Sequence, residues 1–265
     1  MSRRIAIAIV GVWCAAGGAW AGRPLAIDDA DPADPGVFEF DAGVGYVRDA
    51  DFHHWDFPVG LAYGLLTNLE VSLGFGGHFE ERLEALDEEG REENVKEDGI
   101  GDLVIGAKWQ FLGESSWLPR QALAAAVKFP TADEDKGLGS GKTDYDLTWV
   151  ASKSLSDKLG AHINAGYSWI GQPDGEDVND VVHYGLALDY QITDTLQWVG
   201  EVFAEKELGD GPDTVVLYNI GFRWSPLDDL TLDVAAGSRL RGDAEDFAAT
   251  AGLTWAFGAA ATENQ

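Results

Sequence analysis

Gly141, Lys142 and Thr143 have the clearest chemical signature in the chain, because Gly-Lys-Thr closes the loop with which many nucleotide-binding proteins hold phosphate. In that loop four residues separate the first glycine from the second, and the first position here is Lys136. The loop should also lead into a helix whose N-terminus faces the phosphates. After Thr143 the chain instead reads "DYDLTWVA", in which apolar and polar residues alternate as in a strand. The sequence therefore predicts a hairpin loop here, not a phosphate site.

Two histidines raise the question of hydrolytic chemistry. His162 and His183 fall on adjacent predicted strands, with Ser168, Asp144 and Asp189 nearby in the sequence. Nucleophilic catalysis needs a serine and its base within hydrogen-bond reach, and no lipase-like Ser/His motif is evident. In the β-barrel predicted below, both histidines point into the lumen. Outer-membrane phospholipases, which are also barrels, carry their serine and histidine on the lipid-facing side, so the arrangement here differs from theirs. We predict no enzyme activity and no catalytic residue, with a lipid hydrolase as the less favoured alternative.

The stretch from 79 to 99 is strongly acidic and raises the question of cation binding. It reads "FEERLEALDEEGREENVKEDG", with ten acidic and three basic side chains and a net charge of −7. Carboxylate oxygens are the hard ligands that Ca²⁺ and Mg²⁺ prefer, so divalent cations are candidate partners of this loop. The acids do not follow the spacing of an ordered calcium loop, and a solvated, partly helical acidic loop is the favoured interpretation. No metal ligand and no cofactor are predicted.

The overall charge excludes one class of partner. The chain has 265 residues with 46 acidic and 18 basic side chains, a formal charge of −28. Such an excess of negative charge repels the phosphates of nucleic acid. We therefore predict no nucleic-acid partner.

The first 21 residues have the pattern of a secretory signal peptide. Arg3 and Arg4 precede the apolar run "IAIAIVGVWCAAGGA", and the small residues of "AWA" at 19–21 predict cleavage after Ala21. The run is shorter than the roughly 20 residues that cross a bilayer as a helix. The single cysteine, Cys14, lies within it, so the mature chain is predicted to contain no thiol.

Alternation with a period of two dominates the remaining chain. In "GDLVIGAKWQF" (101–111) and "VHYGLALDYQ" (182–191) every second residue is apolar, as in a strand rather than a helix. The pattern predicts about twelve strands, each near the 9–11 residues that a tilted transmembrane strand needs. We place them at 37–47, 54–64, 69–78, 101–111, 121–130, 144–153, 160–170, 181–192, 195–205, 214–224, 230–238 and 247–257. The register of the ninth, "LQWVGEVFAE", is ambiguous.

Short and long connections alternate between these strands. The short ones lie near 66–68, 154–158, 193–194 and 226–229, and the long polar ones at 79–99, 131–142, 171–180, 206–213 and 239–246. The apolar register, the ninth strand set aside, contains no charged residue, as lipid contact requires. Aromatic residues gather near the strand ends, with Trp55, Tyr145, Tyr167 and Trp169 on one side and Trp109, Tyr190, Trp224, Trp255 and Phe257 on the other.

These features predict an all-β fold, a transmembrane antiparallel up-and-down β-barrel in the bacterial outer membrane. Its long loops would lie outside and its short turns in the periplasm. The alternative is a secreted β-sandwich, whose core face also alternates but which needs neither alternating loop lengths nor two aromatic girdles. In the barrel, the polar register faces the lumen. The lumen-lining candidates are Glu39, Asp41, Glu70, Asp102, Lys108, Lys128, Asp144, Asp146, His162, His183, Asp189, Arg223 and Asp233.

Several motif blocks resemble one known family. "RPLAIDDADPADPGVFEFDAGVGY", "DGIGDLVIGAKWQFL", "VKFPTADEDKGLGSGKTDYDLTWVASKSL" and "INAGYSWIG" occur in order over about 23–257. They are similar to the outer-membrane transporter family labelled "MetA-pathway of phenol degradation". The resemblance implies an outer-membrane barrel that passes small molecules, aromatic ones among them. It brings no catalytic residues.

The expected organisation has four parts. They are the signal peptide at 1–21, a periplasmic N-terminal extension or plug at 22–36, the barrel at 37–257 and a C-terminal tail at 258–265. In the extension, Arg23 and the pair Asp28 and Asp29 are expected to dock near the periplasmic mouth. The expected function is a channel or transporter, with a non-conducting structural or surface-interaction barrel as the alternative. The expected partners are outer-membrane lipid, lipopolysaccharide and small solutes.

Overall fold

The structure is a computed structural model, and it describes residues 22–49, 52–85, 92–136, 138–173, 178–209 and 214–258. The side chains of 52 and of 80–95 are not described. The predicted signal peptide and the tail after Gly258 lie outside the described residues.

The described residues form thirteen strands and one short 3-10 helix, η1 (Glu134–Lys136). The strands are β1 (Val37–Asp49), β2 (Phe52–Leu66), β3 (Leu69–Ala85), β4 (Glu92–Ile100), β5 (Leu103–Leu112), β6 (Arg120–Phe129), β7 (Asp144–Ser154), β8 (Leu159–Trp169), β9 (Val181–Gln191), β10 (Leu196–Glu207), β11 (Val215–Leu227), β12 (Leu230–Arg241) and β13 (Phe247–Gly258). No helix in the described part of the chain is long and apolar enough to cross a membrane.

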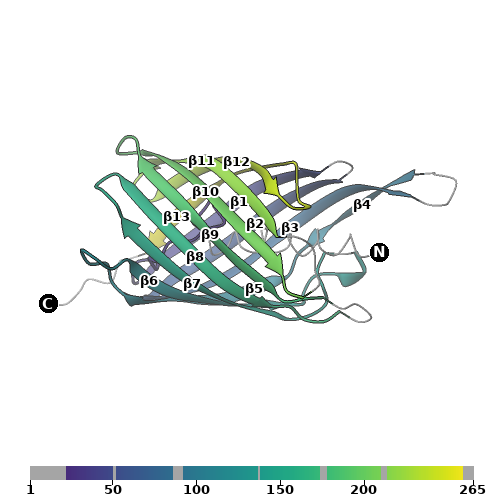
Figure 1. The fold of residues 1–265 in the computed structure, drawn as a ribbon, viewed down its shortest axis with the longest axis horizontal. Coiled ribbons are helices and arrows are strands. Elements are labelled where there is room, and N and C mark those ends of the chain that lie inside the picture. The colour runs from purple at the N-terminus through teal and green to yellow at the C-terminus, as the bar shows by residue number, and fades with distance from the viewer. Residues whose placement is uncertain are drawn as a thin grey trace.

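The sheet closes on itself, because β1 pairs antiparallel with both β2 and β13. All other strands pair with their neighbours in sequence, apart from an exchange at β3. There β5 pairs with residues 69–74 of β3, and β4 pairs with residues 77–85 further along the same strand. Strand β5 is thus the neighbour of β3 near the short-turn end, and β4 is its neighbour further along, so the two count as one strand of the wall. The result is the predicted all-β fold, a closed antiparallel barrel of twelve strands (Figure 1).

The two ends of the barrel differ. At the short-turn end, β1 begins, β13 ends and tight connections join β2 to β3 and β11 to β12. At the long-loop end lie the connections 130–143 and 170–180 and the protruding hairpin of β3 and β4 (Figure 1).

The predicted partly helical loop at 79–99 is wrong in its secondary structure. Phe79 pairs with Asp98 and Ala85 with Glu92, so both sides of this stretch are strand backbone. Its composition, rich in Glu, Leu and Ala, favours a helix. The ladder that β3 has already begun lower in the barrel continues through it, however, and pairing overrides the local preference.

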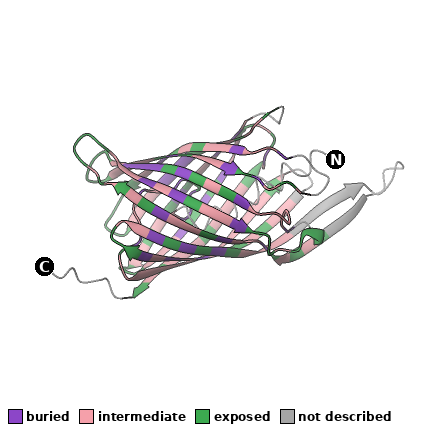
Figure 2. Cartoon of the chain, turned by 90° about the horizontal axis from the view of Figure 1, so that it is seen from below, coloured by how far each residue is buried: buried purple, intermediate pink, exposed green. Residues whose placement is uncertain are grey.

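Large apolar side chains are exposed over the outward register of the wall. Ile220 on β11 and Val234 on β12 are exposed by 49% and 52%, and Phe75 on β3 by 45%. Exposed and less exposed residues alternate along the strands (Figure 2). A water-soluble protein rarely leaves so large an apolar surface uncovered, so this outer face is suited to lipid.

The predicted girdle aromatics lie at the two rims of this surface. At the long-loop end Tyr46 and Trp55 have ring centroids 4.7 Å apart, and Tyr145 pairs in register with Trp169. At the short-turn end the rings of Trp255 and Phe257 lie 4.9 Å apart. Amphipathic rings of this kind suit the boundary between lipid and water.

A charge placed in the middle of the outer face should therefore destabilise the protein. Leu186, near the centre of β9, is 47% exposed on the apolar side. We expect Leu186→Arg to lower the free energy of unfolding from phospholipid vesicles by about 2–4 kcal/mol. The control is Leu155→Arg, in the turn after β7, where the cost should be about 0–1 kcal/mol. Equal losses in urea titrations of the two variants would show that this face does not contact lipid.

Candidate functional site

Residues 22–36, here called the N-terminal segment, lie inside the barrel. The segment is fixed at the short-turn end, where the amide of Gly36 donates to the carbonyl oxygen of Gly64 at 2.8 Å. From there it contacts side chains of β3, β5, β6, β7, β10, β11 and β12. These strands surround the lumen, so the segment crosses its interior.

Arg23 is the deepest charged anchor of this segment. Its Nε and one Nη each donate to the carboxylate of Asp233 at 3.1 Å, with both side chains almost fully buried. Glycines on the two closing strands make room for the guanidinium group. A Cβ at Gly43 or Gly252 would lie 2.5 or 2.3 Å from its atoms. Arg223 in turn donates from Nε to the carbonyl oxygen of Arg23 at 2.5 Å.

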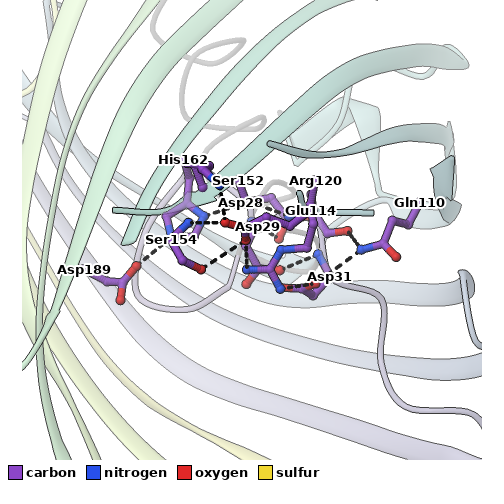
Figure 3. A network of polar contacts seen from close by, with 12 residues as sticks. Asp28, Asp29, Asp31, Gln110, Glu114, Arg120, Ser152, Ser154, His162 and Asp189 are labelled. Carbon is purple, nitrogen blue, oxygen red and sulfur yellow. Dashed lines mark hydrogen bonds and ion pairs between the residues drawn. The ribbon is translucent and has the colours of Figure 1, made fainter. Parts of the chain in front are cut away.

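Asp28 and Asp31 meet cations of the opposite wall. Lys108 on β5 lies 3.1 Å from the Asp28 carboxylate, with side chains 6% and 9% exposed. Arg120 at the start of β6 lies 2.6 Å from Asp31. The Gln110 side-chain amide also donates to Asp31, at 3.3 Å. Gln110 and Arg120 thus both point toward Asp31 of the segment (Figure 3).

Two inward carboxylates accept hydrogen bonds from the backbone of the segment. Glu70 on β3 accepts from the amide of Ala33 at 2.8 Å. Glu201 on β10 accepts from the amides of Ala26 and Ile27 at 2.9 and 2.8 Å. Backbone amides without a helix or ladder need such partners when they are buried, and the lumen acids supply them.

One side of the lumen is apolar. Leu25 and Ile27 of the segment share a buried cluster with Val199 and Phe203 of β10 and with Leu217 of β11. These contacts define the register of β10, which was ambiguous from the sequence. Every second residue, Val199, Glu201 and Phe203, faces the inside of the barrel.

A serine, a histidine and an aspartate form a hydrogen-bonded chain at the segment. The Asp189 carboxylate lies 2.7 Å from Nε2 of His162, and Nδ1 of His162 lies 2.9 Å from the Ser152 hydroxyl (Figure 3). The Ser152 oxygen accepts from the amide of Ala30 at 2.9 Å, and Ser152 is only 1% exposed. With the segment in place the Ser152 hydroxyl is covered by the backbone of Ala30, so this chain of hydrogen bonds holds the segment against the wall.

A second set of predicted residues holds the long-loop end. Lys128 lies 2.5 Å from Asp144 and 3.4 Å from Asp102. Asp102 accepts from the amides of Thr131 and Ala132, both at 2.9 Å, and Asp144 accepts from the amide of Gly171 at 2.8 Å. The three side chains therefore tie two long loops to the wall.

The other predicted residues lie apart from these groups. His183 and Ser168 both contact the same oxygen of Asp146, each at 2.8 Å. Asp41 on β1 accepts from the hydroxyl of Thr254 at 2.6 Å, and Glu39 is on the same inner register. Ser168 donates to Asp146 and makes no described contact with a histidine, so the pair considered for hydrolysis does not form.

Three residues that contact the segment, Glu201, Arg120 and Ser152, were not among the predicted lumen residues. A signal for Glu201 was present, since a charge in the middle of a membrane strand is tolerated only on the inner face. Arg120 begins β6 and Ser152 lies near the end of β7, where period-two alternation carries less information.

Removing one partner of the buried pair of Lys108 and Asp28 should destabilise the protein strongly. Replacing Lys108 by Met leaves the Asp28 carboxylate buried without its cation, and we expect a loss of about 3–5 kcal/mol in the free energy of unfolding. Asp28→Asn should cost less when Lys108 is already Met, because the two residues interact directly. Urea unfolding of the two single variants and the double variant measures this coupling.

Lys153 is the matched control. It also lies on a strand and contacts an acid, Glu114, at 2.7 Å, but the two side chains are 28% and 20% exposed. Lys153→Met should cost less than about 1 kcal/mol. A loss as large as that of Lys108→Met would contradict the role assigned to burial.

The fold is shared with channels and porins of known structure. An outer membrane channel from Pseudomonas putida F1 matches with a TM-score of 0.67 at 15% identity, covering 86% of this chain and 98% of that one. The NanC porin matches with 0.59 at 10% identity, covering 82% and 98%. The toluene transporter TodX from Pseudomonas putida matches with 0.51 at 9% identity, covering 91% and 97%.

The family of the chain is identified by its sequence rather than by the shared fold. No curated protein matches the chain. A family profile, in contrast, matches residues 21–257, which confirms the resemblance drawn from the sequence motifs. Because the match covers most of its length, the chain belongs to the family described as "Putative MetA-pathway of phenol degradation".

Proposed function

We propose that the protein is an outer-membrane channel for small solutes, aromatic compounds among them. The observation that carries this proposal is the closed twelve-strand wall, apolar and exposed outside and lined inside by charged and polar side chains. A wall of this kind isolates a polar interior from lipid, which is the arrangement of channel-forming barrels.

The solute class rests on the family and on the fold. The description of the family refers to a pathway of phenol degradation. TodX, which has a similar fold, is a toluene transporter. The buried cluster of Leu25, Ile27, Val199, Phe203 and Leu217 adds an apolar side to the lumen. An aromatic solute could pass such a side if the N-terminal segment moved. The other proposed partners are membrane lipid and lipopolysaccharide, at the apolar face and its outer rim.

We further propose that the N-terminal segment is a plug that regulates passage. Its anchors are Arg23, Asp28, Asp31 and the backbone amides held by Glu70 and Glu201. The same contacts favour a second candidate function, a non-conducting structural barrel, if the segment never moves. Conductance separates the two functions.

Planar-bilayer recording tests conduction directly. The refolded protein should produce discrete current steps, and in a salt gradient the reversal potential should indicate cation preference, because the formal charge is −28 and acids prevail in the lumen. Liposome swelling with phenols, aromatic acids and sugars then ranks solutes. Absence of current in repeated reconstitutions would support the non-conducting barrel.

Deletion of residues 23–34 tests the plug. Removing the segment takes away the Arg23 and Asp28 anchors while leaving β1 intact, so single-channel conductance should rise clearly above that of the intact chain. Lys153→Met, which does not contact the segment, should leave conductance unchanged. If the deletion variant folds and conducts like the intact protein, the segment is not a plug.

A further inference from the structure

His54, Asp56 and His78 form a compact cluster at the long-loop end of the barrel, away from the N-terminal segment. His54 and Asp56 are two residues apart on β2 and so share a face, and His78 on β3 stands directly opposite Asp56. The neighbours Trp55 and Phe57 are exposed on the outer face, which places the cluster on the inner one. The three side chains are 13–15% exposed.

The potential ligand atoms of the cluster converge. Nε2 of His54 lies 2.6 Å from Oδ1 of Asp56, and Nδ1 of His78 lies 2.8 Å from the same oxygen. The two ring nitrogens are 3.4 Å apart. These atoms therefore form one small triangle, with two imidazole nitrogens and one carboxylate oxygen at its corners.

Glycines leave space around this triangle. Gly101, where β4 gives way to β5, has no side chain, and a Cβ there would lie 2.3 Å from Nε2 of His78. Gly45 on β1 stands opposite Asp56 in the ladder. Because β1, β2 and β3 are paired strands of one sheet, the backbone fixes the positions of the three side chains.

We propose that His54, Asp56 and His78 bind one divalent transition-metal ion of the zinc class. Zn²⁺ takes imidazole nitrogens and carboxylate oxygens at about 2.0–2.2 Å, and in a tetrahedral site such ligands are about 3.3 Å apart. The ligand atoms are 2.6–3.4 Å apart, so a shift of about 0.7 Å or less opens the triangle around the ion. Mg²⁺ and Ca²⁺ prefer ligand sets made only of oxygen and fit less well.

The described residues supply three protein ligands, and water or a solute can complete the coordination of the ion. The surroundings also favour cations. The hairpin of β3 and β4 rises from the same strand that carries His78, and its sequence from 79 to 99 has a net charge of −7. A negative field at a rim raises the local concentration of cations.

Calorimetry of the refolded barrel with Zn²⁺, using protein without a polyhistidine tag, tests the proposal. We expect one ion per chain, and Co²⁺ in its place should give the visible absorption of a site with nitrogen ligands. Asp56→Asn and His78→Ala should each weaken Zn²⁺ binding by more than about tenfold, since losing a ligand costs more than losing one of its supporting groups.

His53→Ala is the matched control. His53 is adjacent on β2 but belongs to the opposite register and contacts the Tyr46 hydroxyl at 2.8 Å. His183→Ala is a second control, since this inward histidine contacts Asp146, and the structure describes no second histidine at that carboxylate. Both variants should retain wild-type affinity. The proposal is overturned if the wild-type barrel takes up no Zn²⁺, or if all variants bind it equally, as they would at the acidic hairpin. Heat-modified gel mobility verifies that each variant is folded.

Discussion

Strands β1 and β13 pair along their whole length, from Val37 opposite Gly258 to Arg48 opposite Phe247. In lipid, an unpaired strand edge would leave amides and carbonyls without partners, at a cost of several kcal/mol for each group. This ladder closes the wall, so neither β1 nor β13 keeps an unpaired edge. It also fixes which residues face lipid and which face the lumen, because a slip by one residue would exchange the two faces. The contents of the lumen therefore follow from closure.

Closure places many carboxylates in a confined interior, and the N-terminal segment helps to neutralise them. It contributes Arg23 to Asp233 and backbone amides to Glu70 and Glu201. Basic side chains of the wall in turn form ion pairs with the acids of the segment, as Lys108 does with Asp28. Burial makes each such pair costly to break from one side only. The segment and wall are thus electrostatically complementary, and moving the segment requires water or solute to replace these contacts.

Sequence reasoning found the wall more easily than the interior. Strands exposed to lipid on one face must alternate, so periodicity predicted the all-β barrel that the structure shows. The hairpin at 79–99 was missed because local composition favours a helix while pairing decides. The contact of Lys108 with Asp28 joins residues 80 positions apart. Asp28 lies in the N-terminal segment, whose sequence has no periodicity from which its partners could be predicted. His54 and His78 share an inner surface only through the register of β2 and β3, which alternation alone does not specify.

The binding place of Arg23 has a consequence for the order of assembly. It is built from Gly43 on β1, Gly252 on β13 and Asp233 on β12, so it draws on both ends of the chain. None of these strands forms it alone, and it exists only once the seam between the first and last strands has closed. The β12 and β13 hairpin supplies Asp233 and Gly252, and β1 adds Gly43 from across the seam. The complete surroundings of Arg23 therefore exist only when the first and last strands have paired.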